Sequence, residues 1–289
     1  MLIAQATDIH IGFDRGNPEE ANMQRLRAVL GRMVDGPNRP DMLLLTGDLT
    51  EWGDDESFAR LAAEVRDLPF PVHAMAGNHD LRAALVRAFP GTPLQDGFVQ
   101  YAIEQDGLRL LMLDTVLDGQ HGGDFCETRA AWLAAELAAH PKTPTVIVMH
   151  HPMIEVGIDW MDPDPEAEWI LRFAAAVRGH NQIVGILTGH VHRTILGQWH
   201  GLPVSICQSV APRVALNLNR IDPEVPDGRD LITDELPAWG LHRWDGKNLV
   251  SHYESVGRLT PLARYDEKLQ PMIRGIMAER PGAIFPSGK

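Results

Sequence analysis

The N-terminal part of the chain alternates apolar runs with segments of helical periodicity. Apolar residues dominate 2–7, 41–46 and 72–76, which predicts three buried strands. Between these runs, 19–35 and 55–67 place apolar side chains at every third or fourth position, which predicts two amphipathic helices. This β-α-β-α-β order predicts right-handed crossovers and a parallel sheet. Ligands of such sheets bind beyond the carboxyl ends of the strands.

The rest of the pattern predicts a second sheet. The turn signal Asp106-Gly107 separates two apolar runs, 98–105 and 108–113, and favours a hairpin that begins this sheet. The remaining expected elements are helices over 81–89, 128–140 and 165–178, strands over 145–149 and 183–188, and hairpins over 194–208 and 239–253. We therefore predict an α/β fold, a four-layer α-β-β-α sandwich of two mixed sheets with a small cap.

Two segments do not fit the sandwich. Over 212–237 and 257–289 the apolar periodicity weakens, and Pro, Asp and Asn become frequent. We expect 1–211 and 238–256 to form the main domain, and the two other segments to form a cap or an oligomerisation surface. Their apolar side chains need a partner surface, which is either their own domain, under a lid, or another subunit.

Polar signatures follow the predicted strands. Gly77-Asn78-His79-Asp80 comes after the third strand, and taken alone it could be a tight turn whose Asn and Asp bond their own backbone. The others are Asp8-Ile9-His10, Gly47-Asp48, His150-His151-Pro152 and Gly189-His190-Val191-His192. Because these signatures recur at strand ends, we interpret them as one metal site. We expect His151 to point away from that site if its strand continues.

The candidate ligands offer carboxylate, imidazole and amide groups and no thiolate. They are Asp8, His10, Asp48, Asn78, His150, His190 and His192. Such a set suits Mn, Fe, Co or Zn, and it is too large for one tetrahedral zinc. It suits two ions that share a bridging carboxylate and acidify a bridging water to hydroxide. The reaction expected of such a centre is the hydrolysis of a phosphoester by in-line attack.

The composition of the chain limits the kinds of molecule that it can bind. The 289 residues carry a net charge of −13, which opposes binding to a nucleic-acid polymer. No apolar run approaches the ~18 residues of a membrane-spanning helix, so we expect no membrane segment. Asp8 and His10 lie too near the start to follow a cleaved signal peptide, so we expect a cytoplasmic protein. The two cysteines are too few for a disulfide framework.

Taken in order, the motifs Asp-x-His, Gly-Asp, Gly-Asn-His-Asp, His before x-Pro, and Gly-His-x-His resemble those of the calcineurin-like metallophosphoesterases. They span positions 8 to 192. By this resemblance the main domain would be catalytic. One ion would be held by Asp8, His10 and His192, the other by Asn78, His150 and His190, and Asp48 would bridge. His79 would contact the phosphoryl group or assist the leaving group, and Asp80 would orient His79.

Two positions that differ from the motifs of known subfamilies indicate which subfamily the chain resembles. Glu51 stands where purple acid phosphatases carry a tyrosine ligand, and Asp80 stands where Ser/Thr phosphatases carry Glu. The chain resembles most the bacterial class III cyclic nucleotide phosphodiesterases and glycerophosphodiesterases. This implies hydrolysis of glycerophosphodiesters or 3',5'-cyclic nucleotides, and a homo-oligomer. A phosphomonoesterase or nucleotidase stays open because the same hydroxide attacks both ester types, and so does a non-catalytic scaffold, although no ligand is missing.

Overall fold

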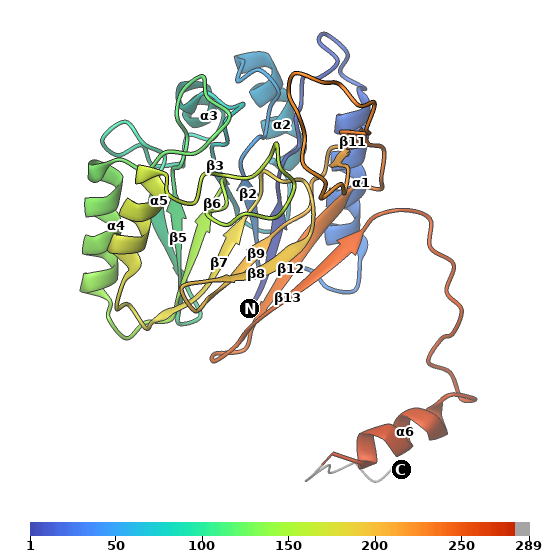
Figure 1. Ribbon diagram of the computed structural model, residues 1–289. Coiled ribbons are helices and arrows are strands. Elements are labelled where there is room, and N and C mark those ends of the chain that lie inside the picture. Colours follow the sequence, from blue (N-terminus) through green and yellow to red (C-terminus); the bar gives the residue numbers. More distant parts are fainter. Residues whose placement is uncertain (281–289) are drawn as a thin grey trace. The chain divides into compact units, whose positions relative to one another are not determined.

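Two β-sheets lie back to back in the first of two units of the chain (Figure 1). The computed structural model describes residues 1–280, with the first unit spanning Met1–Val256 and the second beginning at Gly257. The first sheet has the order β13 (Leu249–Ser255), β12 (Ala238–Trp244), β1 (Leu2–Ala6), β2 (Met42–Thr46) and β3 (Val72–Met75). Strands β1, β2 and β3 are parallel, and the hairpin of β12 and β13 joins β1 antiparallel.

The second sheet is also mixed. Its order is β4 (Tyr101–Gln105), β5 (Leu108–Leu113), β6 (Thr145–Met149), β7 (Ile183–Thr188), β9 (Leu202–Ile206) and β8 (Ile195–Trp199). Strands β5, β6, β7 and β9 are parallel, and β4 and β8 close the two edges antiparallel. The three predicted hairpins are therefore confirmed: β4–β5 and β8–β9 lie in the second sheet, and β12–β13 lies in the first.

The helices cover the outer faces of the sheets, as Figure 1 shows. They are α1 (Ala21–Asp35), α2 (Asp55–Val65), α3 (Arg82–Ala88), α4 (Glu127–Ala139) and α5 (Glu168–Val177). Side chains of α1 and α2 pack with the first sheet in one apolar cluster, and those of α4 and α5 pack on the second sheet in another. The alternating residues of β5 divide between these clusters, Leu110 inward and Leu111 outward. The predicted four-layer sandwich is confirmed.

Three elements were not expected from the sequence. The short strands β10 (Arg213–Val214) and β11 (Ile232–Thr233) pair with each other inside the first unit. Helix α6 (Gln270–Ala278) belongs to the second unit. Segment 212–237, which we call the cap segment, thus shares a unit with the main domain. Whether it serves as a cap, and whether 257–289 serves oligomerisation, stay predictions, and 281–289 lie outside the described residues.

Three arginines hold the cap segment. Arg25 donates to the Glu235 carbonyl oxygen within the segment, and its Nε atom donates at 2.7 Å to the carbonyl oxygen of Val210, just before the segment. Arg193 donates to the Val214 carbonyl oxygen at 2.8 Å. Arg213 donates to the Glu235 carboxylate at 2.6 Å. These bonds fix both ends of a segment that contains little regular structure.

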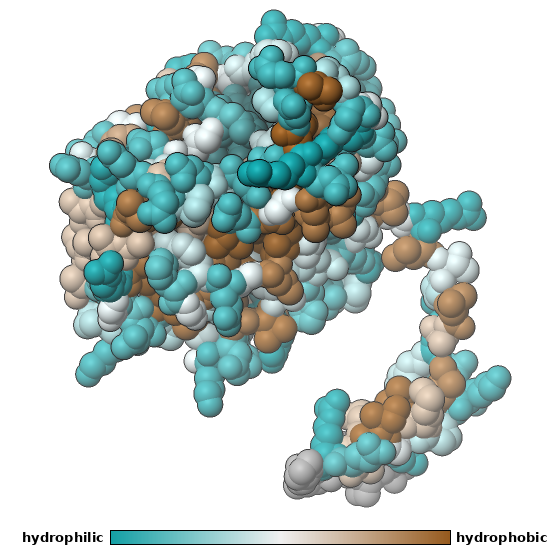
Figure 2. All heavy atoms as spheres, in the orientation of Figure 1, coloured by the Kyte–Doolittle hydropathy of each residue, from teal (hydrophilic) through white to brown (hydrophobic). Residues whose placement is uncertain are grey.

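Apolar side chains are also exposed on the first unit. Figure 2 shows them among hydrophilic residues on the visible face, over the region that β8, β9 and β13 occupy in Figure 1. Leu196 in β8 and Val250 in β13 are exposed apolar residues of these strands. In the described part of the chain, no helix combines the length and apolarity needed to cross a bilayer.

Candidate metal centre

All seven predicted ligands lie beyond the carboxyl ends of parallel strands, at one edge of the first unit. Asp8 and His10 follow β1, Asp48 follows β2, Asn78 follows β3, His150 follows β6, and His190 and His192 follow β7. The ligating atoms of Asp8, His10 and His192 lie within 4.8 Å of one another, as do those of Asp8, Asp48 and His150. The topology therefore brings together residues that lie up to 184 positions apart in the sequence, from Asp8 to His192.

Backbone strain concentrates at this edge. Five of the seven predicted ligands have positive φ, with 52° at Asp8, 53° at His10, 48° at Asp48, 70° at His190 and 58° at His192. A non-glycine residue in such a conformation costs on the order of 1–3 kcal/mol and persists only where the surrounding structure enforces it. Strain of this kind clusters at functional sites, which supports a function for this edge.

Two glycines allow the turns to approach one another closely. A Cβ atom on Gly47 would lie 2.4 Å from the His150 ring, and one on Gly77 would lie 2.2 Å from the Asp48 backbone nitrogen. Gly47 also has a φ of 93°, a conformation that glycine adopts at little cost. The motifs Gly-Asp and Gly-Asn-His-Asp therefore need their glycines so that β2, β3 and β6 can present side chains to one point.

Hydrogen bonds set the orientation of the histidine rings. The Nδ1 atoms of His10, His150 and His192 lie 2.7, 2.9 and 2.8 Å from the Glu51 carboxylate, the Thr46 carbonyl oxygen and the Pro212 carbonyl oxygen, respectively. Because these oxygens accept, each Nδ1 donates and each Nε2 is directed at the other predicted ligands. His190 is reversed, with Nδ1 3.1 Å from the Asn78 Oδ1 atom. Such oriented imidazoles are typical of metal ligands.

Asp48 reaches both predicted ligand sets. Its Oδ2 atom lies 3.3 Å from His150 Nε2, in one set, and 3.8 Å from His10 Nε2, in the other. Its Oδ1 atom accepts a hydrogen bond of 2.9 Å from the backbone nitrogen of His79. Within the first set, His10 Nε2 lies 3.2 Å from His192 Nε2. A carboxylate in this position can serve two ions.

One buried atom indicates that the residues fit a metal. His150 Nε2 is buried and makes no well-aligned hydrogen bond among the described residues, although the Asp48 Oδ2 atom lies 3.3 Å away. Leaving such a group unsatisfied costs about 1–3 kcal/mol, which a metal bond would remove. Neutral imidazoles and carboxylates around it form a donor set suited to first-row transition ions. The groups of Asp and His side chains at this edge therefore provide donors for metal binding.

Burial and nearby charge shift the pKa values of the predicted histidine ligands in opposite directions. Burial lowers the pKa of His190 well below its usual value and also lowers the pKa of His192, so both rings are neutral and can ligate. Burial likewise opposes protonation of His150, but the negative charge of Asp48 raises the pKa of His150 to about 9. His150 thus carries a proton that a metal ion would displace.

The structure gives Asp80 a different contact from the expected one. Its carboxylate accepts from the backbone nitrogens of Leu49, Thr50 and Gly77 at 2.9 to 3.0 Å. It therefore ties together the turns after β2 and β3 and does not hold the His79 ring, whose Nδ1 lies 3.0 Å from the Glu51 carbonyl oxygen. Burial and the nearby charge of Asp48 raise the pKa of Asp80 to about 6.

Sequence reasoning missed Glu51 as a functional residue. Its carboxylate holds His10 and its carbonyl oxygen holds His79, so one residue links a predicted ligand to the predicted catalytic histidine. The signal for Glu51 was its place three positions after Asp48, in the turn that carries the predicted bridging ligand.

His151 is not directed away from the site. The strand before it ends at Met149. The His151 ring is buried, and its centroid lies 4.7 Å from the centroid of the His190 ring. His151 Nδ1 pairs with the Thr115 hydroxyl at 2.9 Å, and Nε2 pairs with the His121 carbonyl oxygen at 3.2 Å. The His121 ring in turn lies 4.6 Å from His190. His151 thus positions the loop that carries His121 beside the predicted ligands.

A hollow of about 430 Å³ opens over the candidate metal centre. Its floor is polar and includes most of the predicted site. The polar residues that line it are His10, Asn22, Asp48, Glu51, His79, His121, His190 and His192. Its wall is apolar and includes Phe13, Trp160 and Ile232. A small organic ester therefore has room beside the predicted metal ligands.

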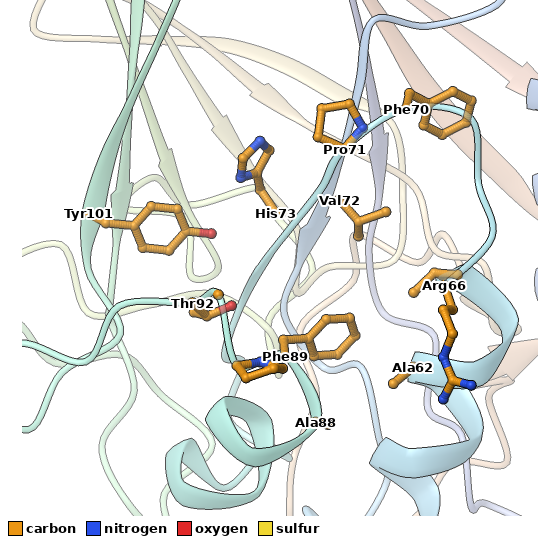
Figure 3. Close-up of a pocket in the computed structure, with 13 residues that line it drawn as sticks. Ala62, Arg66, Phe70, Pro71, Val72, His73, Ala88, Phe89, Thr92 and Tyr101 are labelled. Carbon is orange, nitrogen blue, oxygen red and sulfur yellow. The ribbon is translucent and has the colours of Figure 1, made fainter.

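A larger hollow, of about 560 Å³, lies at the opposite end of β3 (Figure 3). Its walls come from α2, α3 and the start of β3, with Phe89 and Tyr101 among the lining residues. None of its lining residues is Asp or Glu, and His73 is its only histidine. It offers no metal donor set, so we place the chemistry in the smaller hollow.

Comparisons with known proteins identify the family of the chain. The sequence profile described as calcineurin-like phosphoesterase matches residues 1–194. A "Probable cyclic nucleotide phosphodiesterase" of Rhodopseudomonas palustris is 35% identical over 205 residues, which cover 68% of this chain and 72% of that protein. A "Probable glycerophosphodiester phosphodiesterase" of Arcobacter nitrofigilis is 27% identical over 275 residues, 93% of this chain and 98% of that protein.

Solved structures support the fold. A dimetal phosphatase from Danio rerio superposes with a TM-score of 0.61 at 15% identity, and the match covers 89% of this chain and 99% of that chain. The matched part of the chain, residues 1–194, includes all seven predicted ligand positions, from Asp8 to His192. The chain is therefore a hydrolase and belongs to the calcineurin-like phosphoesterase family of metal-dependent enzymes.

Proposed function

We propose that this protein hydrolyses small phosphodiesters with two transition-metal ions bound at the carboxyl edge of its sheets. The observation that carries the proposal is the convergence of seven oxygen and nitrogen donors, with Asp48 within 3.3 Å of His150 and 3.8 Å of His10. A single carboxylate between two ligand sets is the arrangement that a binuclear centre requires.

Each predicted ligand receives a role. Asp8, His10 and His192 would hold one ion, and Asn78, His150 and His190 would hold the other. Asp48 would serve both. When bound, the ions would supply Lewis acidity to the phosphoryl oxygens and lower the pKa of a water molecule toward neutrality. Mn, Fe, Co and Zn all match the donor set.

His79 would act on the substrate. Its Nδ1 atom lies 3.0 Å from the Glu51 carbonyl oxygen, which only accepts, so Nδ1 carries a proton and Nε2 is left for the ester. The ring lines the hollow and is partly exposed. In the imidazolium form Nε2 also carries a proton, and it can then donate a hydrogen bond to the phosphoryl group or a proton to the departing alkoxide. Asp80 is a positioning residue, because it holds the two turns that carry Asp48 and His79.

The proposed substrate class rests on the names of the relatives and on the net charge of the chain. The relatives are named for cyclic nucleotides and glycerophosphodiesters, both small diesters. The net charge of −13 disfavours nucleic-acid polymers, so the substrate would be a small molecule. A homo-oligomer is the expected assembly.

A substrate panel tests this proposal. We would assay bis-p-nitrophenyl phosphate, p-nitrophenyl phosphate, cyclic AMP and glycerophosphodiesters with added Mn²⁺. We expect diesters to react with a higher kcat/KM than p-nitrophenyl phosphate. A preference for the monoester would instead assign a phosphomonoesterase or nucleotidase. If no ester is hydrolysed by a chain that binds no metal, the fold serves as a scaffold.

A further inference from the structure

Three parts of the chain supply an apolar wall beside the candidate metal centre. Phe13 comes from the β1–α1 loop, Trp160 and Met161 come from the β6–α5 loop, and Val214 and Ile232 come from β10 and β11. Phe13 is 69% exposed, Ile232 51% and Trp160 36%, whereas Val214 and Met161 are buried behind them. Large apolar side chains are therefore presented to a hollow whose floor is made of histidines and carboxylates.

Hydrogen bonds hold this wall in place. The Asp159 carboxylate accepts from the Ile221 backbone nitrogen at 2.9 Å, which ties the loop of Trp160 to the cap segment. Arg193 donates to the Val214 carbonyl oxygen at 2.8 Å. Because the loops are fixed to each other, the wall is formed before a ligand arrives, and binding pays little ordering entropy.

Positive charge is missing from the wall. No lysine or arginine is among the described residues that line the hollow. A second anionic group on the substrate would thus find no partner there. The hydroxyl groups of a glycerol moiety would lose water against apolar carbon without gaining hydrogen bonds, which disfavours their binding. An aromatic ring would instead bury surface on Phe13, Trp160 and Ile232.

We infer that the wall of Phe13, Trp160 and Ile232 is a specificity site for the group that remains on phosphorus, and that it selects diesters in which this group is aromatic over diesters in which it is glycerol. The inference rests on the proposed function, because it concerns the ester that the candidate metal centre hydrolyses. Nucleobases and simple aryl groups share the flat apolar surface that the wall would contact.

A matched pair of substrates isolates this preference. The Mn²⁺-loaded full chain would be assayed with p-nitrophenyl benzyl phosphate and p-nitrophenyl 2,3-dihydroxypropyl phosphate, which release the same p-nitrophenolate. Their difference lies only in the group that remains on phosphorus. We expect kcat/KM to favour the benzyl ester by about 10-fold or more, the range of small changes in an apolar pocket.

Variants assign the preference to the wall. Phe13→Ser, Trp160→Ser and Ile232→Ser should each lower the ratio of the two kcat/KM values. The matched control is Leu196→Ser, which removes an apolar side chain that is 72% exposed on β8, outside the hollow. It should leave the ratio unchanged. Calorimetry with benzyl and 2,3-dihydroxypropyl methylphosphonate measures the same preference as a ratio of Kd values, without turnover.

The outcomes separate this inference from the proposed function. Hydrolysis of both diesters with equal kcat/KM, or a ratio that the three wall variants leave intact, overturns the specificity site while the diesterase function stands. Hydrolysis of neither diester by Mn²⁺-loaded protein overturns the proposed function and the inference with it. If the wall variants lower the molecular mass in light scattering without changing the ratio, these side chains form a subunit interface and the inference is wrong.

Discussion

The Nδ1 atom of His10 lies 2.7 Å from a carboxylate oxygen of Glu51. This contact fixes the ring so that Nε2 lies 3.2 Å from His192 Nε2, among the predicted ligands of one ion. A carboxylate behind a histidine ligand raises the basicity of the ring and fixes its orientation. Glu51 would therefore act on a bound metal ion through His10.

Glu51→Gln should weaken metal binding. The amide keeps most of the shape of Glu51 but removes the charge that supports His10, and losses of this kind are about 10- to 100-fold in metal affinity or activity. The measurement is a Mn²⁺ titration of the metal-free variant by calorimetry. Glu56→Gln is the control, because Glu56 is an exposed carboxylate in α2 and its replacement removes the same charge. Equal affinity for both variants would contradict the role of Glu51.

His79→Ala should lower the catalytic rate with little change in metal content. If His79 protonates the leaving group, the loss should be about 10²-fold or more for a diester with an alkyl leaving group. It should shrink for p-nitrophenolate, which departs without a proton. Steady-state kinetics on both esters and elemental analysis of the variant test this. An equal loss on both esters would favour a role in binding the phosphoryl group.

Much of this site could be predicted because its residues follow strong apolar strands. Asp8, Asp48 and His150 each come just after a run of buried residues, and the parallel order of those runs places their ends at one edge. Strand periodicity and turn signals depend on residues that are close together in the chain, so they can be recognised in the sequence alone. The two-sheet arrangement followed from the same local patterns.

Contacts made by loops could not be predicted in this way. The side-chain direction of Asp80, toward the turn after β2 and not toward His79, depends on how two turns meet. The contacts of Glu51 with His10 and of His151 with Thr115 also depend on how separate loops meet. Strands β10 and β11 have two residues each, too few for a period, and α6 contains Pro271 and Gly275, which weaken a helical pattern.

Deleting the residues after Gly257 should lower the oligomeric mass. The second unit begins there, and α6 has no buried residue although Met272 and Ile276 are apolar. Such side chains need a partner surface, which another subunit would provide. Light scattering of the full chain and of the truncated chain measures the mass, and kinetics on two diesters measures the selectivity. A monomeric full chain, or a truncation without effect on either, would contradict this prediction.

His242 should make the fold acid-sensitive. Burial lowers the pKa of His242 to about 3, and the ring pairs with Gln5 and Ser251. In the unfolded chain the pKa is about 6.5, so below that pH the unfolded state binds a proton that the folded state does not. The contribution of His242 to the free energy of unfolding is therefore fully present above pH 6.5, and it is lost as the pH decreases below that value. The loss should be about 2 kcal/mol at pH 5.

Urea unfolding of the metal-free protein at pH 7.5 and pH 5 measures this loss. In His242→Gln the decrease between the two pH values should be smaller by about the same amount, because glutamine does not titrate. The other histidines titrate alike in both proteins and cancel in the difference. His242→Asn provides a second neutral replacement. An identical pH dependence in the wild type and both variants would show that His242 does not carry the effect.

The number of metal ions per chain in the wild type and in Asp48→Ala tests the binuclear centre most directly. Each protein would be stripped with a chelator, reconstituted with Mn²⁺, and measured by elemental analysis together with diester hydrolysis. We predict two ions and restored activity for the wild type. Asp48→Ala should lose more metal and activity than His10→Ala or Asn78→Ala, since it removes a ligand from both ions. Full activity of the stripped wild type, or an Asp48→Ala variant that outperforms those two, would contradict the account.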